Sequence, residues 1–420
     1  MRIRSMALVE SRSIWLIHPY AGGPGVGRYD RPYQLAKQWE SMGWHGIVLT
    51  PSEHHLLDAP RAPGLASIDG VTYNFIRAPA YEGNGLGRLI NMAVFTAKLL
   101  HQADSLAAKY GRPAMVIASS PHPYCFLAAE RLAHRFNCRC VFEVRDLWPL
   151  SLVELAGLAP INPLVLFTGW LERRAYRKAD AVVSLLPCTR EYMVDRGLEE
   201  RRWKYIPNGV KTNQEDVEAE NSDACKLANK WRAEGRMVVV YAGALGRPNH
   251  VRSLVSAMAL QHAEGVNTAA IIVGRGEQES ELKALIVQLG LLGRVAIFEQ
   301  IPKRAVLTLL RQADVGFISL RPEPLFRFGV SPNKLFDYMM AGLPVLFAVQ
   351  AGNDPVREAG CGYSVDPGQP EAISAALTKL ASMSLTARRE MGQRGRYWVE
   401  RHHGYASLAR DYLALAEGSN

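Results

Sequence analysis

The chain has 420 residues, 48% of them hydrophobic, so it is long enough to form two domains with separate buried cores. Residues 1–210 contain 25 Lys and Arg against 18 Asp and Glu, a balance of +7 that leaves +2 of the total +9 for the second half. The first half has neither a zinc-finger pattern nor the basic-aromatic spacing of an RNA-binding sheet. Its charge therefore favours a phosphorylated substrate or an anionic membrane surface over nucleic acid.

The sequence carries no clear signal for secretion or membrane insertion and no cysteine pattern of a metal site. We find no N-terminal secretion signal and no apolar run long enough to span a bilayer, and we expect a cytoplasmic protein. The six cysteines have neither the paired spacing nor the neighbouring histidines of a zinc site, so we expect reduced thiols.

The first half opens with a strand, a glycine loop, a helix and a second strand. Four glycines fall in the six residues 22–27, and Gly23 lies where the backbone can approach a ligand closely. A plain turn is the alternative interpretation. The spacing does not match GxGxxG and the second strand lacks a following acidic residue, which disfavours a nicotinamide cofactor.

Polar residues follow two later strands of the first half. Ser120 and His122 come after one strand, and Arg145 and Asp146 come after the next. Because ligands bind at the carboxyl ends of parallel strands, these residues are site candidates. The alternatives are that His122 is structural and that Arg145 and Asp146 only pair with each other.

Two helical segments of the first half carry large apolar surfaces. The helix 89–100, preceded by a loop that contains Asn84, is apolar almost all round and is expected to be buried or to touch lipid. The helix 163–180 combines apolar residues with four Arg and Lys. That combination is typical of an interfacial helix near anionic lipid and equally of a core helix with a solvated end.

The second half repeats the strand and glycine-loop pattern. Residues 211–235 are polar and charged, and we interpret them as a linker. Two strands then enter glycine loops that contain Gly243 and Gly274, with Arg247 as a cation in the first loop. Ile301 follows the next strand.

The stretch 331–344 reads as a short helix that leads into a strand. After Ser331, a proline opens the helix at Asn333, and Lys334 lies in its first turn. A helix start with a nearby cation favours an anion such as a phosphate, and Asp337 adds a carboxylate one turn later. An ordinary surface helix with a solvated Lys and Asp is the alternative.

Seven motifs in this order resemble the retaining glycosyltransferases of family 4, which have the GT-B fold. Within them, the chain resembles bacterial O-antigen and capsule enzymes of the fucosaminyltransferase-like branch. The resemblance covers nearly the whole length. The motifs are residues 22–25, 81–85, 143–149, 206–210, 241–243, 273–276 and 331–344.

The resemblance implies an α/β protein with two Rossmann-like domains that face each other across a cleft. Residues 1–210 are expected to bind the acceptor and residues 211–390 the nucleotide sugar, while 391–420 form a C-terminal helix that packs back on the first domain. The implied reaction moves a sugar from a UDP-linked donor, with retention and without metal or cofactor, to a hydroxyl of a glycan acceptor. A polyprenyl-diphosphate-linked acceptor in lipopolysaccharide O-antigen synthesis is expected, with contact to the anionic inner face of the membrane.

The candidate site residues come from the positions described above and from the resemblance together. Lys334, Arg247 and His122 are the candidate catalytic residues. The candidate donor-binding residues are Gly23, Gly243, Gly274, Ile301, Ser331, Asn333 and Asp337. The candidate acceptor or cleft residues are Ser120, Arg145, Asp146 and Asn84.

The chain departs from the family pattern at two places. The family motif has two glutamates separated by seven residues, which here fall on Gly329 and Asp337. The missing first carboxylate favours an acetamido-deoxy sugar over a plain hexose. The phosphate-binding loop offers only Arg247 where the family has an Arg and a Lys, and Lys334 is expected to supply the second charge. A nucleotide-sugar epimerase of the same architecture and a non-catalytic nucleotide-sugar sensor are the alternatives.

Overall fold

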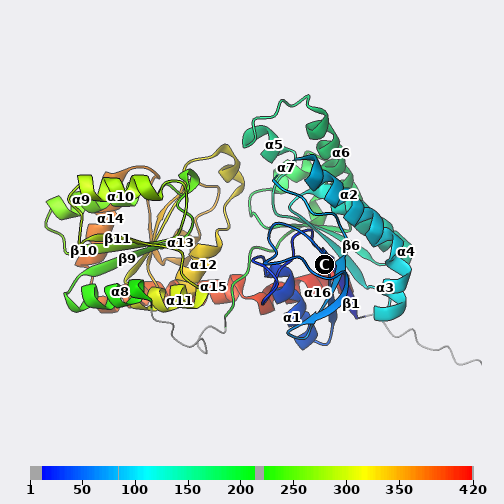
Figure 1. The fold of residues 1–420 in the computed structure, drawn as a ribbon, viewed down its shortest axis with the longest axis horizontal. Helices are drawn as coiled ribbons and strands as arrows, with labels where there is room; N and C mark the ends of the chain where they lie inside the picture. Colours follow the sequence, from blue (N-terminus) through cyan, green and yellow to red (C-terminus); the bar gives the residue numbers. More distant parts are fainter. Residues whose placement is uncertain (1–11, 84, 213–221, 419–420) are drawn as a thin grey trace, which may run out of the picture. The chain divides into compact units, whose positions relative to one another are not determined.

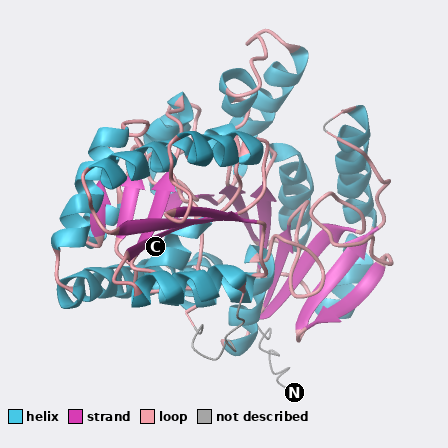
Figure 2. Ribbon diagram, turned by 60° about the vertical axis from the view of Figure 1, so that its left-hand side comes forward, coloured by secondary structure: helices cyan, strands magenta, loops and turns pink. Residues whose placement is uncertain are grey.

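A computed structural model describes residues 12–83, 85–212 and 222–418, which form two compact α/β units (Figure 1). The first unit runs to Pro207 and takes up the chain again from Tyr405, and the second unit comprises Asn208–Gly404. Each unit has its own central sheet with helices packed on it, as expected for two Rossmann-like domains (Figure 2).

The sheet of the first unit has eight strands in the order β3-β4-β2-β1-β5-β6-β7-β8. All neighbours are parallel except β3, which pairs antiparallel with β4. The central strands are buried over their whole length because helices cover both faces. The strands are β1 Ser13–Ile17, β2 His45–Pro51, β3 Gly64–Ile68, β4 Val71–Ile76, β5 Met115–Ser120, β6 Arg139–Val144, β7 Ala181–Ser184 and β8 Trp203–Tyr205.

Short connections join these strands to the helices that cover them. The helices of the first unit are α1 Arg31–Ser41, α2 Leu86–His101, α3 Ala103–Tyr110, the 3-10 turn η1 Pro123–Cys125, α4 Phe126–Phe136, α5 Leu150–Glu154, α6 Pro163–Lys178, α7 Arg190–Val194, η2 Glu200–Arg202 and α16 Tyr405–Glu417.

The second sheet has six parallel strands in the order β11-β10-β9-β12-β13-β14. The chain starts at β9, adds strands on one side, and then crosses over to add β12 on the other. The carboxyl ends of β9 and β12 therefore border the crevice where such sheets bind ligands. The strands are β9 Met237–Ala242, β10 Thr268–Val273, β11 Val295–Phe298, β12 Val315–Ser319, β13 Val345–Ala348 and β14 Gly362–Ser364.

The prediction that residues 211–235 form a linker is largely wrong, because α8 occupies Asp223–Ala233 and packs its apolar side into the core of the second unit. Residues 213–221 lie outside the described part of the chain. The remaining helices are η3 Arg247–Asn249, α9 Arg252–Ala263, α10 Glu279–Gln288, α11 Lys303–Gln312, η4 Pro324–Phe328, α12 Asn333–Met340, α13 Pro355–Ala359, α14 Pro370–Ser382 and α15 Leu385–His403.

The C-terminal helical segment breaks at Gly404 and its two parts belong to different units. Helix α15 packs on α12 and α13 in the second unit, whereas α16 packs on α1 in the first. The chain therefore divides after Pro207 and after Gly404, rather than after 210 and 390. In the first unit, the Trp39 indole donates to the carbonyl of Ala409 at 3.1 Å and helps to hold α16.

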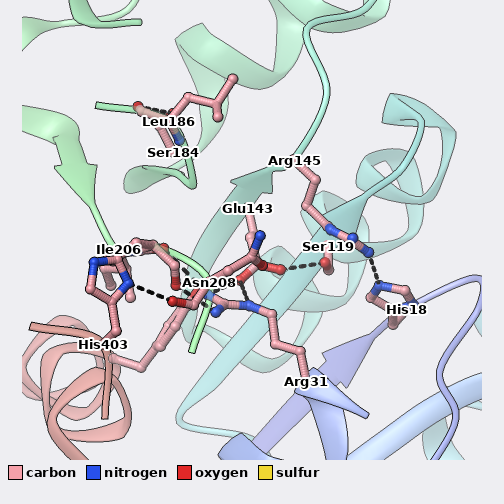
Figure 3. Close-up of polar contacts among 12 residues, drawn as sticks. His18, Arg31, Ser119, Glu143, Arg145, Ser184, Leu186, Ile206, Asn208 and His403 are labelled. Carbon is pink, nitrogen blue, oxygen red and sulfur yellow. Dashed lines mark hydrogen bonds and ion pairs between the residues drawn. The ribbon is translucent and has the colours of Figure 1, made fainter. Parts of the chain in front are cut away.

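A buried carboxylate at the end of β6 joins four parts of the first unit (Figure 3). The Glu143 carboxylate accepts hydrogen bonds from Arg31 of α1 at 3.0 and 3.2 Å, from the Ser119 hydroxyl of β5, and from the Tyr412 hydroxyl of α16. Arg31 also donates to the carbonyl of Pro207 at 2.6 Å. Burial acts to raise the pKa of Glu143, but Arg31 and the two hydroxyls outweigh it and lower that pKa, so the carboxylate stays ionised.

Glu143→Ala should lower the free energy of unfolding by about 3–5 kcal/mol, because it leaves the Arg31 guanidinium buried without its counter-charge. Urea denaturation of the purified protein measures the loss. Asp104→Ala removes an exposed ion pair with Arg135 and is the control that should unfold like the wild type. A loss below about 1 kcal/mol for Glu143→Ala would contradict the structural role of the carboxylate.

Candidate functional site

The crevice of the second unit contains a pocket of about 420 Å³. Loops at the carboxyl ends of β9 and β10 form one side, and the starts of α11 and α12 form the other. Its lining residues are Ala242, Gly243, Ala244, Val273, Gly274, Arg275, Gln300, Ile301, Lys303, Val306, Lys334, Asp337 and Tyr338.

Lys334 brings a buried ammonium group to this pocket. Its Nζ donates to the Tyr241 hydroxyl at 3.0 Å and to Oδ1 of Asn249 at 2.7 Å, and lies 4.6 Å from the centre of the Tyr241 ring. These partners are neutral, so burial lowers the pKa of Lys334 to about 8. A bound anion would offset that burial and stabilise the charged form.

Two glycines allow the loops around Lys334 to approach each other. A Cβ at Gly274 would lie 1.8 Å from the carbonyl oxygen of Gly243, and a Cβ at Gly243 would lie 2.9 Å from Nζ of Lys334. The loops are joined by a hydrogen bond from the Gly243 amide to the carbonyl of Val273 at 2.9 Å. A side chain at Gly274 would therefore collide with the backbone, whereas a side chain at Gly243 would require the Lys334 ammonium to move away from the first loop.

The predicted residues Ile301 and Asp337 also line the pocket. The Asp337 carboxylate pairs with Nζ of Lys303, a residue that the sequence did not single out. Because Asp337 lies one turn after Lys334 on α12, the pocket presents a cation and a carboxylate side by side.

Three other predicted residues of the second half lie outside the pocket lining. Arg247 is exposed and lies near Glu277, because η3 turns Asn249 rather than Arg247 toward Lys334. Asn333 is exposed at the first position of α12, whose first turn has no side-chain cap. The hydroxyl oxygen of Ser331 is buried without a hydrogen-bond partner in the described structure.

Gly329, which replaces the first family glutamate, has a backbone angle φ of 98°. L-amino acids with side chains are strained in this region, so the turn before α12 requires glycine. The side-chain amide of Asn353 fixes the turn, since it accepts from the amide of Val330 at 2.7 Å and donates to the carbonyl of the same residue at 3.1 Å. The conformation of this turn therefore disfavours the family glutamate at position 329.

Polar side chains of the first unit gather at the ends of four neighbouring strands. His18 follows β1, His54 follows β2, His122 follows β5 and Arg145 follows β6. The Arg145 guanidinium lies 3.1 Å from Nε2 of His18 and 3.8 Å from the centre of the Tyr29 ring (Figure 3). Arg145 and His18 therefore lie together at this edge of the sheet.

His122 is buried between the rings of Tyr20 and Tyr124, at centroid distances of 6.0 and 5.1 Å. Neither of its ring nitrogens has a hydrogen-bond partner in the described residues. Burial lowers the pKa of His122 to about 3, so the ring is neutral at pH 7. A neutral imidazole with both nitrogens unpaired can donate to and accept from a ligand hydroxyl.

The other predicted residues of the first half differ in placement. Ser120 is buried at the end of β5, and Asp146 is exposed. Gly23 lies in a tight loop of the first unit, closed by a hydrogen bond from its amide to the carbonyl of Gly27 at 3.1 Å. Asn84 lies outside the described residues.

The sequence patterns did not point to several residues that lie at these sites. Tyr241 and Asn249 hold Lys334. In the first unit, Arg88 donates to the Tyr20 hydroxyl at 2.8 Å, beside His122. Arg88 lies in the first turn of α2 and Asn249 ends η3, but which neighbour each side chain meets depends on contacts between distant parts of the chain.

No group of three or more His, Cys, Asp or Glu side chains in the described residues has the arrangement of a metal site. No helix there has the length and the apolar character needed to cross a membrane.

Comparison with known families divides the chain in the same way. Residues 25–209 match the glycosyl transferase 4-like domain, and residues 226–398 match the glycosyl transferases group 1 domain. A 2-deoxystreptamine glucosyltransferase from Streptomyces kanamyceticus is 23% identical over 248 residues, which are 59% of this chain. The match spans 62% of that relative's length.

Solved structures share the fold over almost the whole chain. Sucrose-phosphate synthase from Thermosynechococcus elongatus has a TM-score of 0.67 at 20% identity, covering 97% of this chain and 98% of its own. WaaG, a glycosyltransferase involved in lipopolysaccharide biosynthesis, has a TM-score of 0.62 at 17% identity, covering 97% and 100%. Anabaena HepE, solved in complex with UDP-glucose, has a TM-score of 0.61 at 16% identity, covering 97% and 98%.

The first half of the chain thus matches a glycosyl transferase 4-like domain and the second half a glycosyl transferases group 1 domain. Over almost its whole length the chain has the GT-B fold of solved glycosyltransferases.

Anion binding to the pocket should weaken as the pH rises through about 8, because Lys334 then loses the charge that the anion stabilises. Titration with sulfate, which stays fully ionised, should show a dissociation constant that rises toward tenfold per pH unit above pH 8. Lys334→Met should bind sulfate weakly at every pH. A wild-type affinity that does not change between pH 7 and 10 would be inconsistent with this role of Lys334.

Gly243→Ala should displace the Lys334 ammonium, because the new methyl group would lie 2.9 Å from Nζ. We expect sulfate affinity at pH 7 to fall several-fold while the melting temperature stays near that of the wild type. Gly246→Ala in the same loop is the control, since its Cβ would meet only Pro248 at an ordinary 3.6 Å. Equal affinities for the two variants would show that the position of the ammonium is unimportant.

Proposed function

We propose that the protein transfers a sugar from a nucleotide donor, UDP-linked, to a hydroxyl of a glycan acceptor, with retention of configuration and without metal or cofactor. The observation that carries the proposal is the pocket of the second unit, where the buried Lys334 ammonium lies beside the uncapped first turn of α12. Both features favour a diphosphate. The structural neighbour HepE, solved in complex with UDP-glucose, supports UDP as the nucleotide.

In this mechanism Lys334 stabilises the negative charge that develops on the leaving diphosphate. Its hydrogen bonds to Tyr241 and Asn249 fix the ammonium before the donor arrives, so little reorganisation is needed during the reaction. Asp337, oriented by Lys303, accepts hydrogen bonds from the ribose hydroxyls of the nucleotide. The retaining course is inferred from the family resemblance of the seven motifs.

The strand-end cluster of the first unit is the proposed acceptor site. His122 can meet the acceptor hydroxyl as a neutral hydrogen-bonding group, and Arg145 and Arg88 suit an acidic acceptor such as a polyprenyl-diphosphate-linked sugar. The glycine at position 329 leaves the donor sugar without the usual carboxylate, which favours an acetamido-deoxy sugar. These features suit O-antigen or capsule synthesis on the cytoplasmic face of the membrane.

Incubation of the protein with UDP-, GDP- and dTDP-sugars and a polyprenyl-diphosphate-sugar acceptor tests the proposal. We expect acceptor-dependent release of UDP, and a loss of about a hundredfold in turnover for Lys334→Ala because one charge that stabilises the transition state is removed. Acceptor-independent conversion of the donor would instead indicate an epimerase. Donor binding without turnover would indicate a nucleotide-sugar sensor, and near wild-type turnover of Lys334→Ala would refute the phosphate role.

A further inference from the structure

Large apolar side chains are exposed on the segment formed by α5, α6 and the connection between them. Figure 1 shows that this connection extends away from the strands of the first unit. We call this set, together with Arg173 and Arg177, the α5–α6 surface. Its apolar members and their exposed fractions are Leu155 59%, Ile161 82%, Leu166 56%, Phe167 49% and Trp170 48%.

The exposed residues of α6 lie on one face of the helix. Leu166, Trp170, Arg173 and Arg177 follow at intervals of four, three and four, and so share one stripe. The stripe is apolar in the first half of the helix and basic in the second. Between residues 155 and 179 the only acidic residue is Glu172, which is buried.

The opposite face of α6 is anchored in the first unit. The Glu172 carboxylate accepts hydrogen bonds from the hydroxyls of Tyr176 at 3.0 Å and Tyr192 at 3.2 Å. Helix α6 therefore packs on the first unit through the face opposite the stripe, and substitutions on the stripe should leave the fold intact.

A row of aromatic rings connects this surface to the proposed acceptor site. The His122 ring lies 5.1 Å from the Tyr124 ring, measured between centroids. The Tyr124 ring lies 6.0 Å from the Phe167 ring, and the Phe167 ring lies 6.0 Å from the Trp170 ring. The Tyr124 hydroxyl also lies 3.0 Å from that of Thr168, which fixes η1 against α6. An exposed apolar surface is thus continuous with a buried polar site.

We propose that the α5–α6 surface docks on a bilayer that contains anionic lipid. Exposed Leu, Ile, Phe and Trp side chains enter the boundary between headgroups and acyl chains, and the basic end of the stripe meets the lipid phosphates. A second part of the proposal rests on the proposed function: the aromatic row leads from the bilayer to His122 and guides a lipid-linked acceptor to that residue.

Sedimentation with phosphatidylglycerol–phosphatidylcholine vesicles tests docking without any transfer reaction. The wild type should bind, and Leu166→Ser combined with Trp170→Ser should reduce the partition coefficient tenfold or more. Val287→Ser combined with Leu292→Ser is the matched control, because these apolar residues of the second unit are even more exposed, at 61% and 72%. Equal loss in both pairs, or no loss in the first, would overturn the proposal.

The basic stripe has a separate test. Arg173→Gln combined with Arg177→Gln should weaken binding to anionic vesicles about tenfold or more, since each charge near the surface contributes about fivefold. Binding to pure phosphatidylcholine should not change. Arg311→Gln combined with Arg389→Gln, both exposed in the second unit, should behave like the wild type. A change in oligomeric mass on light scattering with unaltered vesicle binding would identify a protein interface instead, and would also overturn the proposal.

Transfer assays separate docking from acceptor guidance. If the proposed function holds, Leu166→Ser with Trp170→Ser should lower transfer to a vesicle-embedded acceptor and leave transfer to a short water-soluble analogue unchanged. Equal loss with both acceptors would contradict guidance by the aromatic row. If the wild type transfers to neither, the proposed function fails while the vesicle experiments still decide the docking surface.

Discussion

The first unit depends on one buried carboxylate. Glu143 lies at the end of a central strand and holds α1 through Arg31, β5 through Ser119 and α16 through Tyr412. An ion pair removed from water stabilises a fold only when its geometry and hydrogen bonds offset the loss of hydration. Here the extra hydroxyl donors supply that compensation. The same strand end carries Arg145, so a structural charge and a candidate site charge lie two residues apart.

The candidate sites follow from the direction of the strands. Parallel strands bring all their carboxyl ends to one edge, where loops and helix starts expose polar backbone groups. In the second unit this edge holds Lys334, whose pKa burial lowers to about 8, so a bound anion would stabilise its charged form. In the first unit it holds neutral histidines whose nitrogens are buried. In the proposed function, the first arrangement binds the phosphates of the donor and the second meets the hydroxyl of the acceptor.

The sequence predicted the features that depend on local chemistry. Glycine loops after apolar strands located Gly243 and Gly274, and the helix start located Lys334 and Asp337, all of which line one pocket. It failed where distant contacts decide. Arg247 faces Glu277 because η3 turns it away from the pocket, and Lys303 pairs with Asp337 across 34 residues. The hydrogen bond between Tyr412 and Glu143 joins residues 269 apart, which no spacing rule could reveal.

The crossing of the chain at Gly404 makes the second unit an insertion in the first, bounded by residues 208 and 404. A first domain ended at residue 207 would lack α16, expose Trp39 and remove the Tyr412 donor from Glu143. Domain exchange between relatives must therefore replace an internal segment and keep both ends of the recipient. On the proposed function, donor specificity could be transplanted this way while the first unit, including its last helix α16, stays covalently complete.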